Sequence, residues 1–371
     1  MQKKAWTYGI WVALMVLPFF MVQAQHQLRA QLQWQPESHN LQVHQTLTWV
    51  NTDSLPVHHI AMLDWNHAQS DLQSPLVLRF SDEFLRAFFF APESAKGHTF
   101  IQSIESQGQS ISFERLSKQP DVLWVHLPQP AQPGQSITFA LHYQLHLPHD
   151  HFSGYGVHDE QSAEMRSFLI VPAPKAQGQW LLYSDENIDD QYTDPIQYQL
   201  QWNGPDSWQV VASLPESSPG FFEGNTREPL QLRMQQQPHW ETFQIGSAHI
   251  QTNIEAFQLN AVDKAVIWER ILGFVSDKSG QSVQGHWWLS QAQYDKDPLY
   301  GWQEVPHWLN PFQPTFTYEL KCLTAFLGRY IQRQLPLDRR QSPWLTDAIQ
   351  YSWLTAYIDR LFQVQNPPAR K

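Results

Sequence analysis

The sequence contains very little cysteine: Cys322 is the single one in 371 residues. A disulfide within the chain is therefore impossible, and the hydrophobic core must hold the fold together. Basic residues are also scarce, since 24 Lys and Arg stand against 35 Asp and Glu and give a formal net charge of −11. No basic stripe offsets this sign, so nucleic acid is not an expected partner.

Several catalytic signatures are missing as well. The sequence has no glycine-rich phosphate loop and no G-x-S-x-G nucleophile elbow. His126 and Asp121 have no serine partner that the sequence identifies, which disfavours a serine hydrolase. No internal repeat is visible, and hydrophobic residues make up 42% of the chain, enough for the cores of two ordinary domains.

The N-terminus has the pattern of a secretory signal peptide. Lys3 and Lys4 precede an apolar run from Ala5 to about Val22, and Val22-Gln-Ala24 then offers a cleavage site. The alternative is a membrane anchor, because the run is close to the ~18 residues that span a bilayer. We predict a signal peptide over residues 1–24, an exported protein of the periplasm or extracellular space, and no transmembrane segment after cleavage.

Residues 25–251 are predicted to form a β-rich N-terminal domain. Apolar and polar residues alternate with period two over Leu41–Val50 and Ile137–Leu147, and over shorter segments at Tyr198–Trp202 and Trp208–Ala212. Pro133-Gly134 and similar pairs mark turns between these runs. Many short alternating strands predict an antiparallel β-sandwich or saddle.

Residues 252–371 have a different, mostly helical pattern. Asn260 is a plausible N-cap for a helix over Ala261–Val275, and Gly285–Leu289 resembles a buried strand. Two further helices are expected over Thr317–Gln334 and from Ser342-Pro343 to Phe362, where the proline occupies the first helical position. The fold class is therefore α+β.

Four stretches of the sequence resemble motifs of the aminopeptidase N-like metallopeptidases, the M1 family of gluzincins. Three of them occupy the places of the family's substrate-amine loop, of H-E-x-x-H and of W-L-N-E-G, and read Gly301-Trp-Gln-Glu304-Val-Pro306, Tyr318-Glu319-Leu-Lys-Cys322 and Trp344-Leu-Thr-Asp347-Ala348. The fourth lies in the β-region, where Ile196-Gln-Tyr198-Gln-Leu200 leading to Trp208-Gln-Val210-Val-Ala-Ser213 resembles the family's N-terminal saddle domain. In addition, Tyr294-Asp-Lys-Asp-Pro298 is similar to a segment of large secreted bacterial homologues. The resemblance implies that residues 252–371 form a partial thermolysin-like peptidase domain.

The resemblance also implies roles for single residues. In H-E-x-x-H, both histidines bind zinc and the glutamate is the general base, so Glu319 matches that base. Tyr318 and Cys322 replace the two histidines, and Asp347 replaces the glutamate ligand of the next helix. Glu304 matches the residue that binds the substrate amine, or is a solvated turn residue. Because the ligands are replaced, we expect no zinc cofactor here, although active relatives use one.

Glu319 also has a purely structural interpretation. Without a metal it is a helix carboxylate, paired with Arg329 or Lys321. The spacer between Cys322 and Asp347 is longer than the family's, with Arg333–Gln341 resembling an insertion. In active family members the peptidase domain continues well beyond the helix that carries the third zinc ligand. We therefore expect an incomplete peptidase domain here, in which the last helix, with Trp344, Trp353 and Tyr357, is under-packed.

Three hypotheses for function follow. The first is a secreted, catalytically inactive M1-like protein with a binding role, whose candidate partners are peptides or another polypeptide. The second is an active zinc aminopeptidase that uses Glu319 as base. The third is a β-rich structural protein of the cell envelope.

A histidine-rich polar loop holds further candidate metal donors, although a solvated loop without metal is the favoured interpretation. The candidates are His146, His149, His151, His158, Asp150, Asp159 and Glu160.

Overall fold

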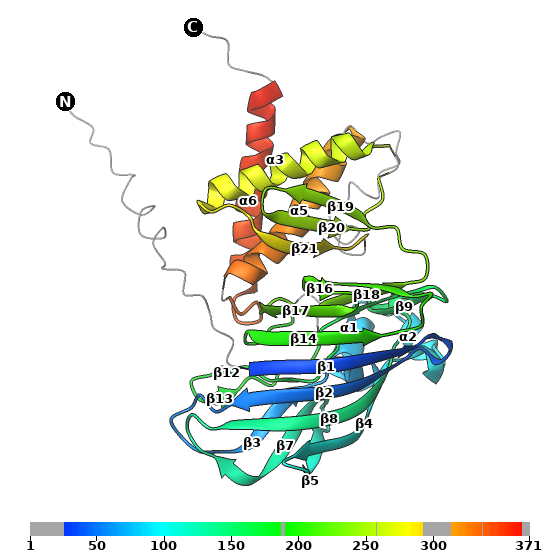
Figure 1. The fold of residues 1–371 in the computed structure, drawn as a ribbon, viewed down its shortest axis with the longest axis vertical. Helices are drawn as coiled ribbons and strands as arrows, with labels where there is room; N and C mark the ends of the chain where they lie inside the picture. The colour runs from blue at the N-terminus through cyan, green and yellow to red at the C-terminus, as the bar shows by residue number, and fades with distance from the viewer. Residues whose placement is uncertain (1–25, 187–189, 257, 292–312, 336, 366–371) are drawn as a thin grey trace, which may run out of the picture.

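The computed structural model describes residues 26–186, 190–256, 258–291, 313–335 and 337–365. The chain forms a β-rich region followed by a mainly helical region, in agreement with the α+β prediction. Figure 1 shows the β-rich region in blue to green and the helices of the second region in yellow to red. None of the helices in the described ranges is both long and apolar enough to cross a membrane.

The largest sheet has eight strands in the order β16-β17-β14-β1-β2-β8-β4-β5. Most neighbours are antiparallel, but β1 runs parallel to β14, so the sheet is mixed rather than purely antiparallel as expected. The strands are β1 (His26–Gln35), β2 (Asn40–Val50), β4 (His98–Ser106), β5 (Gln109–Ser110), β8 (Ser136–His146), β14 (Ile196–Asn203), β16 (Glu216–Ser218) and β17 (Phe221–Thr226).

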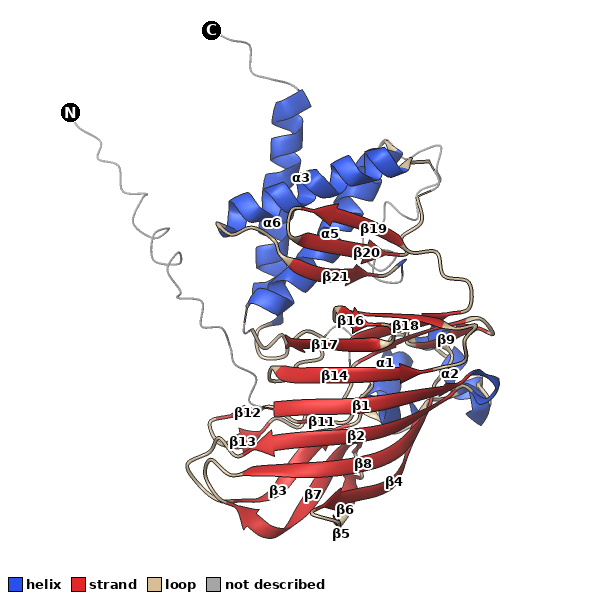
Figure 2. Cartoon of the chain, in the orientation of Figure 1, coloured by secondary structure: helices blue, strands red, loops and turns tan. Residues whose placement is uncertain are grey.

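Three smaller sheets complete the β-rich region (Figure 2). One has the order β11-β3-β7-β6, a second β15-β18-β10-β9, and the third is the hairpin β12-β13. Their strands are β3 (Val57–Leu63), β6 (Phe113–Leu116), β7 (Gln119–Ala131), β9 (Gly156–Asp159), β10 (Ser162–Arg166), β11 (Val171–Pro172), β12 (Lys175–Ala176), β13 (Gln179–Trp180), β15 (Gln209–Ala212) and β18 (Gln231–Gln235).

Short helices that the sequence analysis did not predict lie between these strands. The two α-helices are α1 (Pro75–Asp82) and α2 (Ala87–Phe90). Ser74 caps α1, with its hydroxyl accepting a hydrogen bond from the Val77 amide at 3.3 Å. Phe80 and Phe88 turn inward and pack against Phe152, so these helices form a small apolar cluster of their own.

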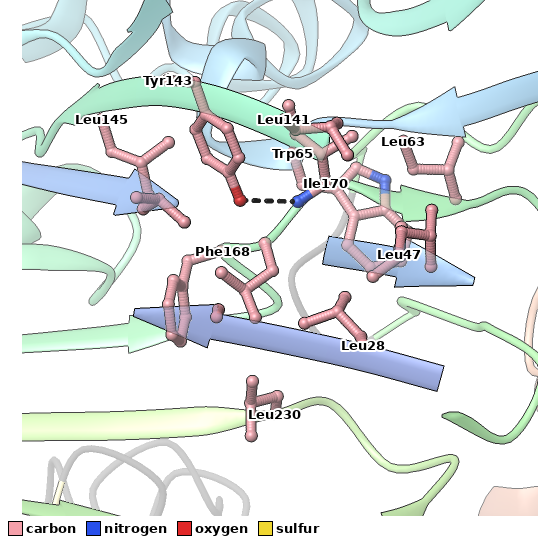
Figure 3. Packing of buried hydrophobic residues seen from close by; sticks show 14 of the residues in the cluster. Leu28, Leu47, Leu63, Trp65, Leu141, Tyr143, Leu145, Phe168, Ile170 and Leu230 are labelled. Carbon is pink, nitrogen blue, oxygen red and sulfur yellow. Dashed lines mark hydrogen bonds between the residues drawn. The ribbon is translucent and has the colours of Figure 1, made fainter. Parts of the chain in front are cut away.

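The main core lies between the large sheet and the sheet β11-β3-β7-β6. Period-two alternation places one side of β1 and β2 in it, as their burial patterns show, whereas β3 and β7 contain runs of consecutive buried residues. One polar group sits in this apolar layer: Gln45 accepts from the Tyr143 hydroxyl at 2.6 Å and donates to the Ile170 carbonyl at 2.6 Å. Figure 3 shows Tyr143 and Ile170 among the surrounding leucines and phenylalanine, with the Tyr143 hydroxyl accepting from the Ile170 amide.

The helical region contains α3 (Ala261–Ser279), α5 (Pro314–Gln334), α6 (Pro343–Gln365) and a three-stranded sheet, β19 (Glu241–Ile245), β20 (Ala248–Thr252) and β21 (Gly285–Leu289). Asn260 caps α3 as predicted, because its side chain accepts from the Asp263 amide at 2.9 Å. The strand prediction for β21 is also confirmed. The α5 helix begins at Pro314, three residues earlier than expected, because proline is favoured at the first helical position.

Strands β19 and β20 fall almost entirely within the predicted N-terminal domain, yet β20 pairs with β21, β19 pairs with β20, and both pack in the core of the helical region. We therefore propose that the boundary between the two regions falls just before Glu241 rather than at residues 251–252. In α6, Trp344 is 69% exposed and Tyr351 is 42% exposed, whereas Tyr357 is buried. Apolar residues thus occupy more than one face of this helix, as the sequence indicated.

Candidate functional site

The candidate site is built around Glu319, which lies near the start of α5. Its side chain is only 5% exposed, and both carboxylate oxygens have partners from other helices. Arg270 of α3 donates from Nε to Oε1 at 3.0 Å and from Nη2 to Oε2 at 2.5 Å. Tyr357 of α6 donates its hydroxyl to Oε1. Three helices therefore meet at one buried carboxylate.

The protonation states of these partners suit a fixed ion pair. Burial raises the pKa of Tyr357 well above its ordinary value, and the Glu319 carboxylate raises it further. Tyr357 therefore stays neutral and acts as a donor. Although burial opposes the charge on Arg270, its hydrogen bonds to Glu319 raise the guanidinium pKa. The expected pairing of Glu319 with Arg329 is wrong, because Arg329 binds Glu228 instead.

The three positions that correspond to zinc ligands lie in different environments. Tyr318 and Cys322 are 2% and 0% exposed and belong to the apolar core of the helical region. Asp347 is 53% exposed on its side chain, and its carboxylate lies 3.7 Å from Arg339. In the described part of the chain, no group of three or more His, Cys, Asp or Glu side chains is placed to hold a metal ion.

These residues do not fit a catalytic zinc. A zinc site needs three converging nitrogen, sulfur or carboxylate donors and an open position for water. Here a phenol and a thiol sit among apolar side chains, and the carboxylate faces solvent beside an arginine. Glu304, the candidate amine-binding residue, lies outside the described residues, as does the N-terminal segment with the signal-peptide pattern.

A surface hollow of about 390 Å³ opens beside Glu319. Helices α3, α5 and α6 all contribute to its wall. Arg270 and Asp263 give it charges of both signs, and the remaining lining is mostly apolar: Val266, Ile267, Phe316 and Leu361, with Thr315. Such a hollow can accommodate a ligand that carries apolar and charged groups together.

A second buried ion cluster joins the two regions. Glu228, between β17 and β18, is 1% exposed and accepts from Arg329 at 3.0 and 3.1 Å and from Arg333 at 2.9 Å, both of α5. Although burial opposes ionisation, the two guanidinium groups hold the pKa of Glu228 below its ordinary value. The Arg333 guanidinium also stacks on Trp287, 3.6 Å from the ring centre.

The segment between α5 and α6, which resembles an insertion, contacts the β-rich region. Tyr183 donates its hydroxyl to Asp338 at 2.5 Å, and the Arg340 guanidinium donates to the backbone carbonyls of Ser184 and Asp190. This segment therefore helps to dock the helices on the sheets.

Two buried aspartates lie next to this docking segment. Burial raises the pKa of Asp121 to about 6. Burial and the neighbouring Asp121 raise the pKa of Asp185 to about 7, against the opposing effect of Arg340 and Arg166. Oδ1 of Asp185 is buried and has no hydrogen-bond partner in the described structure. The folded protein therefore favours the protonated form of Asp185 more than the unfolded chain does.

Replacing Asp185 by asparagine should stabilise the protein at alkaline pH. The pKa of Asp185 is near 3.8 in the unfolded chain and about 7 in the folded protein. The protonated carboxyl therefore contributes its full stabilisation below pH 3.8, and this stabilisation is lost as the pH rises through 7. At pH 8 we expect Asp185→Asn to raise the free energy of unfolding by about 1–2 kcal/mol, which corresponds to a melting temperature roughly 2–8 °C above that of the wild type. Near pH 4 the two melting temperatures should be equal.

Differential scanning calorimetry across this pH range makes the comparison, with the exposed Asp206→Asn as control. An equal loss of stability at both pH values would show that Arg340 and Arg166 need a charged Asp185, and would contradict the prediction.

The histidine-rich loop contains one close pair involving a carboxylate. His158 Nδ1 lies 2.8 Å from Asp150 Oδ2, while the rings of His149 and His151 are 5.2 Å apart. His146 is occupied by Asn40 and by the carbonyl of Ser94. The loop candidates are therefore not gathered around one point.

Sequence reasoning missed the residues that complete the candidate site. Arg270 and Tyr357 lie 49 and 38 positions from Glu319. Arg270 is on the polar side of α3 and Tyr357 is among the apolar residues of α6, so neither had a local signal. Only the packing of three helices brings them to Glu319.

Comparison with known proteins gives a likeness in structure only. No protein-family model matches the sequence, and no curated protein matches it either. An aminopeptidase N family protein from Idiomarina loihiensis is 13% identical with a TM-score of 0.46; the match covers 85% of this chain and 49% of that one. An M1 zinc metallopeptidase from Deinococcus radiodurans is 14% identical with a TM-score of 0.51, covering 91% of this chain and 72% of that one.

The chain thus spans about half the length of the first neighbour and about three quarters of the second. The match to the Deinococcus protein shows that this chain has an M1 metallopeptidase-like fold, which confirms the expectation from the motif positions. At 14% identity the likeness concerns the fold and not the chemistry.

Proposed function

We propose that this protein is an exported, catalytically inactive relative of the M1 metallopeptidases that acts by binding rather than by hydrolysis. The observation that carries the proposal is the state of Glu319. The residue in the general-base position is a buried ion-pair partner whose two oxygens accept from Arg270 and Tyr357. A general base must instead be open to the water that it activates.

The donor chemistry supports the same conclusion. The family mechanism needs a metal to lower the pKa of the attacking water. Tyr318 and Cys322 lie in an apolar core, and Asp347 is exposed beside Arg339. The chain thus keeps the fold but uses the three zinc-ligand positions for packing and ion pairs. This arrangement suits a protein that binds a partner without hydrolysing it.

The hollow beside Glu319 is the candidate binding surface. Arg270 stands at its wall with 49% of its side chain exposed, although it is fixed by Glu319. Phe316 and Leu361 add apolar area, and Asp263 adds an opposite charge. A peptide offers the matching combination of apolar side chains and charged ends, so peptides or another polypeptide are the proposed partners.

Zinc content and hydrolysis test the loss of catalysis. We expect the purified protein to hold far less than one zinc per chain after dialysis and not to hydrolyse aminoacyl amides. The triple variant Tyr318→His, Cys322→His, Asp347→Glu should gain neither stoichiometric zinc nor turnover, because the Asp347 position faces solvent beside Arg339 and Glu319 is still held by Arg270. Elemental analysis and a chromogenic amide assay give the two readouts.

The rival hypothesis of an active zinc aminopeptidase predicts the opposite result. Stoichiometric zinc in the wild type, lost in Cys322→Ala together with amidase activity, would establish it and reject the inactive assignment.

Export is a separate part of the proposal. It rests on Lys3, Lys4, the apolar run and the Val22-Gln-Ala24 site. N-terminal sequencing of the mature protein should begin at Gln25, and a retained Met1 would contradict cleavage.

A further inference from the structure

Histidines face each other across neighbouring strands at four places in the described sheets. In each pair the two residues are direct partners in the strand register. The pairs are His44/His142 (β2–β8), His59/His126 (β3–β7), His98/His146 (β4–β8) and His249/His286 (β20–β21). Two imidazoles at adjacent register positions are spaced so that one metal ion can bind both.

The His59/His126 pair is the one whose surroundings suit a cation. His98 stands opposite His146, whose two ring nitrogens are occupied by Asn40 and the Ser94 carbonyl. His286 donates from Nε2 to the Ala212 carbonyl, and burial together with Arg333 and Arg329 lowers the pKa of His286, so positive charge is disfavoured there. The ring centres of His44 and His142 are 4.6 Å apart. Among the described interactions, however, no hydrogen bond joins these two rings and fixes their orientation.

The geometry of the chosen pair is close to that of two metal ligands. His59 Nδ1 and His126 Nδ1 are 3.0 Å apart. For metal–nitrogen bonds of about 2.0 Å, two ligand nitrogens at right angles lie about 2.8 Å apart, and at the tetrahedral angle about 3.3 Å. The observed spacing falls between these values. Both residues are at the surface of their sheet, so water can complete the coordination shell.

A carboxylate stands behind one of the ligands. Glu114 of β6 places Oε1 3.5 Å from His126 Nε2. A proton on Nε2 that points to this carboxylate leaves the Nδ1 lone pair of His126 available, which is the arrangement that commonly orients a metal-binding histidine. His59 then donates from Nδ1 in the absence of metal. On metal binding its proton moves to Nε2 and each ring turns slightly, so no net proton is released.

We propose that His59 and His126, supported by Glu114, form a binding site for a divalent transition-metal ion on the outer surface of the β3–β7 strand pair, with Cu²⁺ the ion bound most tightly. The site has two protein donors, and water completes its shell. It lies on β3 and β7 and is therefore separate from the degenerate zinc position in α5. Cu²⁺ stands highest in the general order of affinity of nitrogen ligands for divalent metals and accepts a right-angled pair of nitrogens.

Calorimetric titration with Cu²⁺ tests the site in the full-length mature protein, prepared without a histidine tag. His59→Gln and His126→Gln should each weaken one Cu²⁺-binding event at least 10-fold. Glu114→Gln should weaken the same event by about 10-fold or more, the usual effect of removing such a supporting carboxylate. The matched control is His58→Gln, which removes an exposed neighbouring histidine and keeps the pair.

Electron paramagnetic resonance provides a second readout, because nitrogen coordination of Cu²⁺ should diminish in His59→Gln and persist in His58→Gln. Thermal melting of each variant confirms that the fold is retained. If His58→Gln weakens binding as much as His59→Gln does, or if neither His59→Gln nor His126→Gln changes it, the pair is only hydrogen-bonded and the proposal is overturned.

Discussion

Replacing Glu228 by glutamine should lower the free energy of unfolding by about 3–5 kcal/mol, the usual cost of breaking a buried ion pair from one side. Glu228 is 1% exposed and neutralises Arg329, which is 4% exposed, and Arg333, which is 21% exposed. Glutamine keeps the shape and removes the charge, so Arg329 and Arg333 would lose the carboxylate that both of them bind at the junction of the regions, while Glu164 still attracts Arg329. Urea unfolding at neutral pH measures the loss.

The control for this experiment is Glu83→Gln. It makes the same chemical change in an ion pair with Arg79 in which both side chains are about 40% exposed. Exposed pairs contribute about 0–1 kcal/mol, so Glu83→Gln should be nearly neutral. Equal effects of the two substitutions would show that water reaches Glu228 and that the junction does not depend on its charge.

Replacing Arg270 by methionine should cost about 2–3 kcal/mol, less than Glu228→Gln because half of Arg270 is exposed. Methionine retains much of the apolar stem, so the loss reports mainly on the Glu319 carboxylate, which among the described contacts keeps the Tyr357 hydroxyl. Adding Glu319→Gln should then recover at least about 1 kcal/mol, because the buried charge disappears together with its partner. Unfolding curves of both single variants and the double variant supply the comparison.

Arg360→Met is the matched control for this cycle, since Arg360 forms an ion pair with Asp277 in which both side chains are more than half exposed. It should change stability by less than about 1 kcal/mol. A similarly small effect for Arg270→Met would mean that Glu319 is solvated and free to act as a base. That outcome would remove the observation on which the proposed loss of catalysis depends.

Local patterns predicted the main elements because each strand or helix carries its own period. Alternation over Leu41–Val50 identified β2, and Asn260 marked the start of α3. The parallel pairing of β1 with β14 was not predicted, since nothing within a strand specifies the direction of its neighbour. The short helices α1 and α2 were missed because α2 has four residues and α1 has eight, too few for a clear period.

The candidate site was only partly predictable. The motif resemblance located Glu319, Tyr318 and Cys322 on one helix, and the structure places all three there. The partners of Glu319 could not be found in this way, because Arg270 and Tyr357 come from separate helices and their meeting depends on packing. The same reason explains why Arg329 was assigned to the wrong carboxylate: its true partner, Glu228, lies 101 residues away in the β-rich region.

The position of β1 inside the large sheet has a consequence for synthesis. His26 stands beside Ile196, 170 positions later in the chain, so β1 can pair early with β2 but must wait for its other neighbour. While the chain is being made, one edge of the hairpin has unpaired backbone groups. Until β14 emerges, that edge is open to pairing with another chain, so the unfinished protein is more prone to aggregate than the completed sheet.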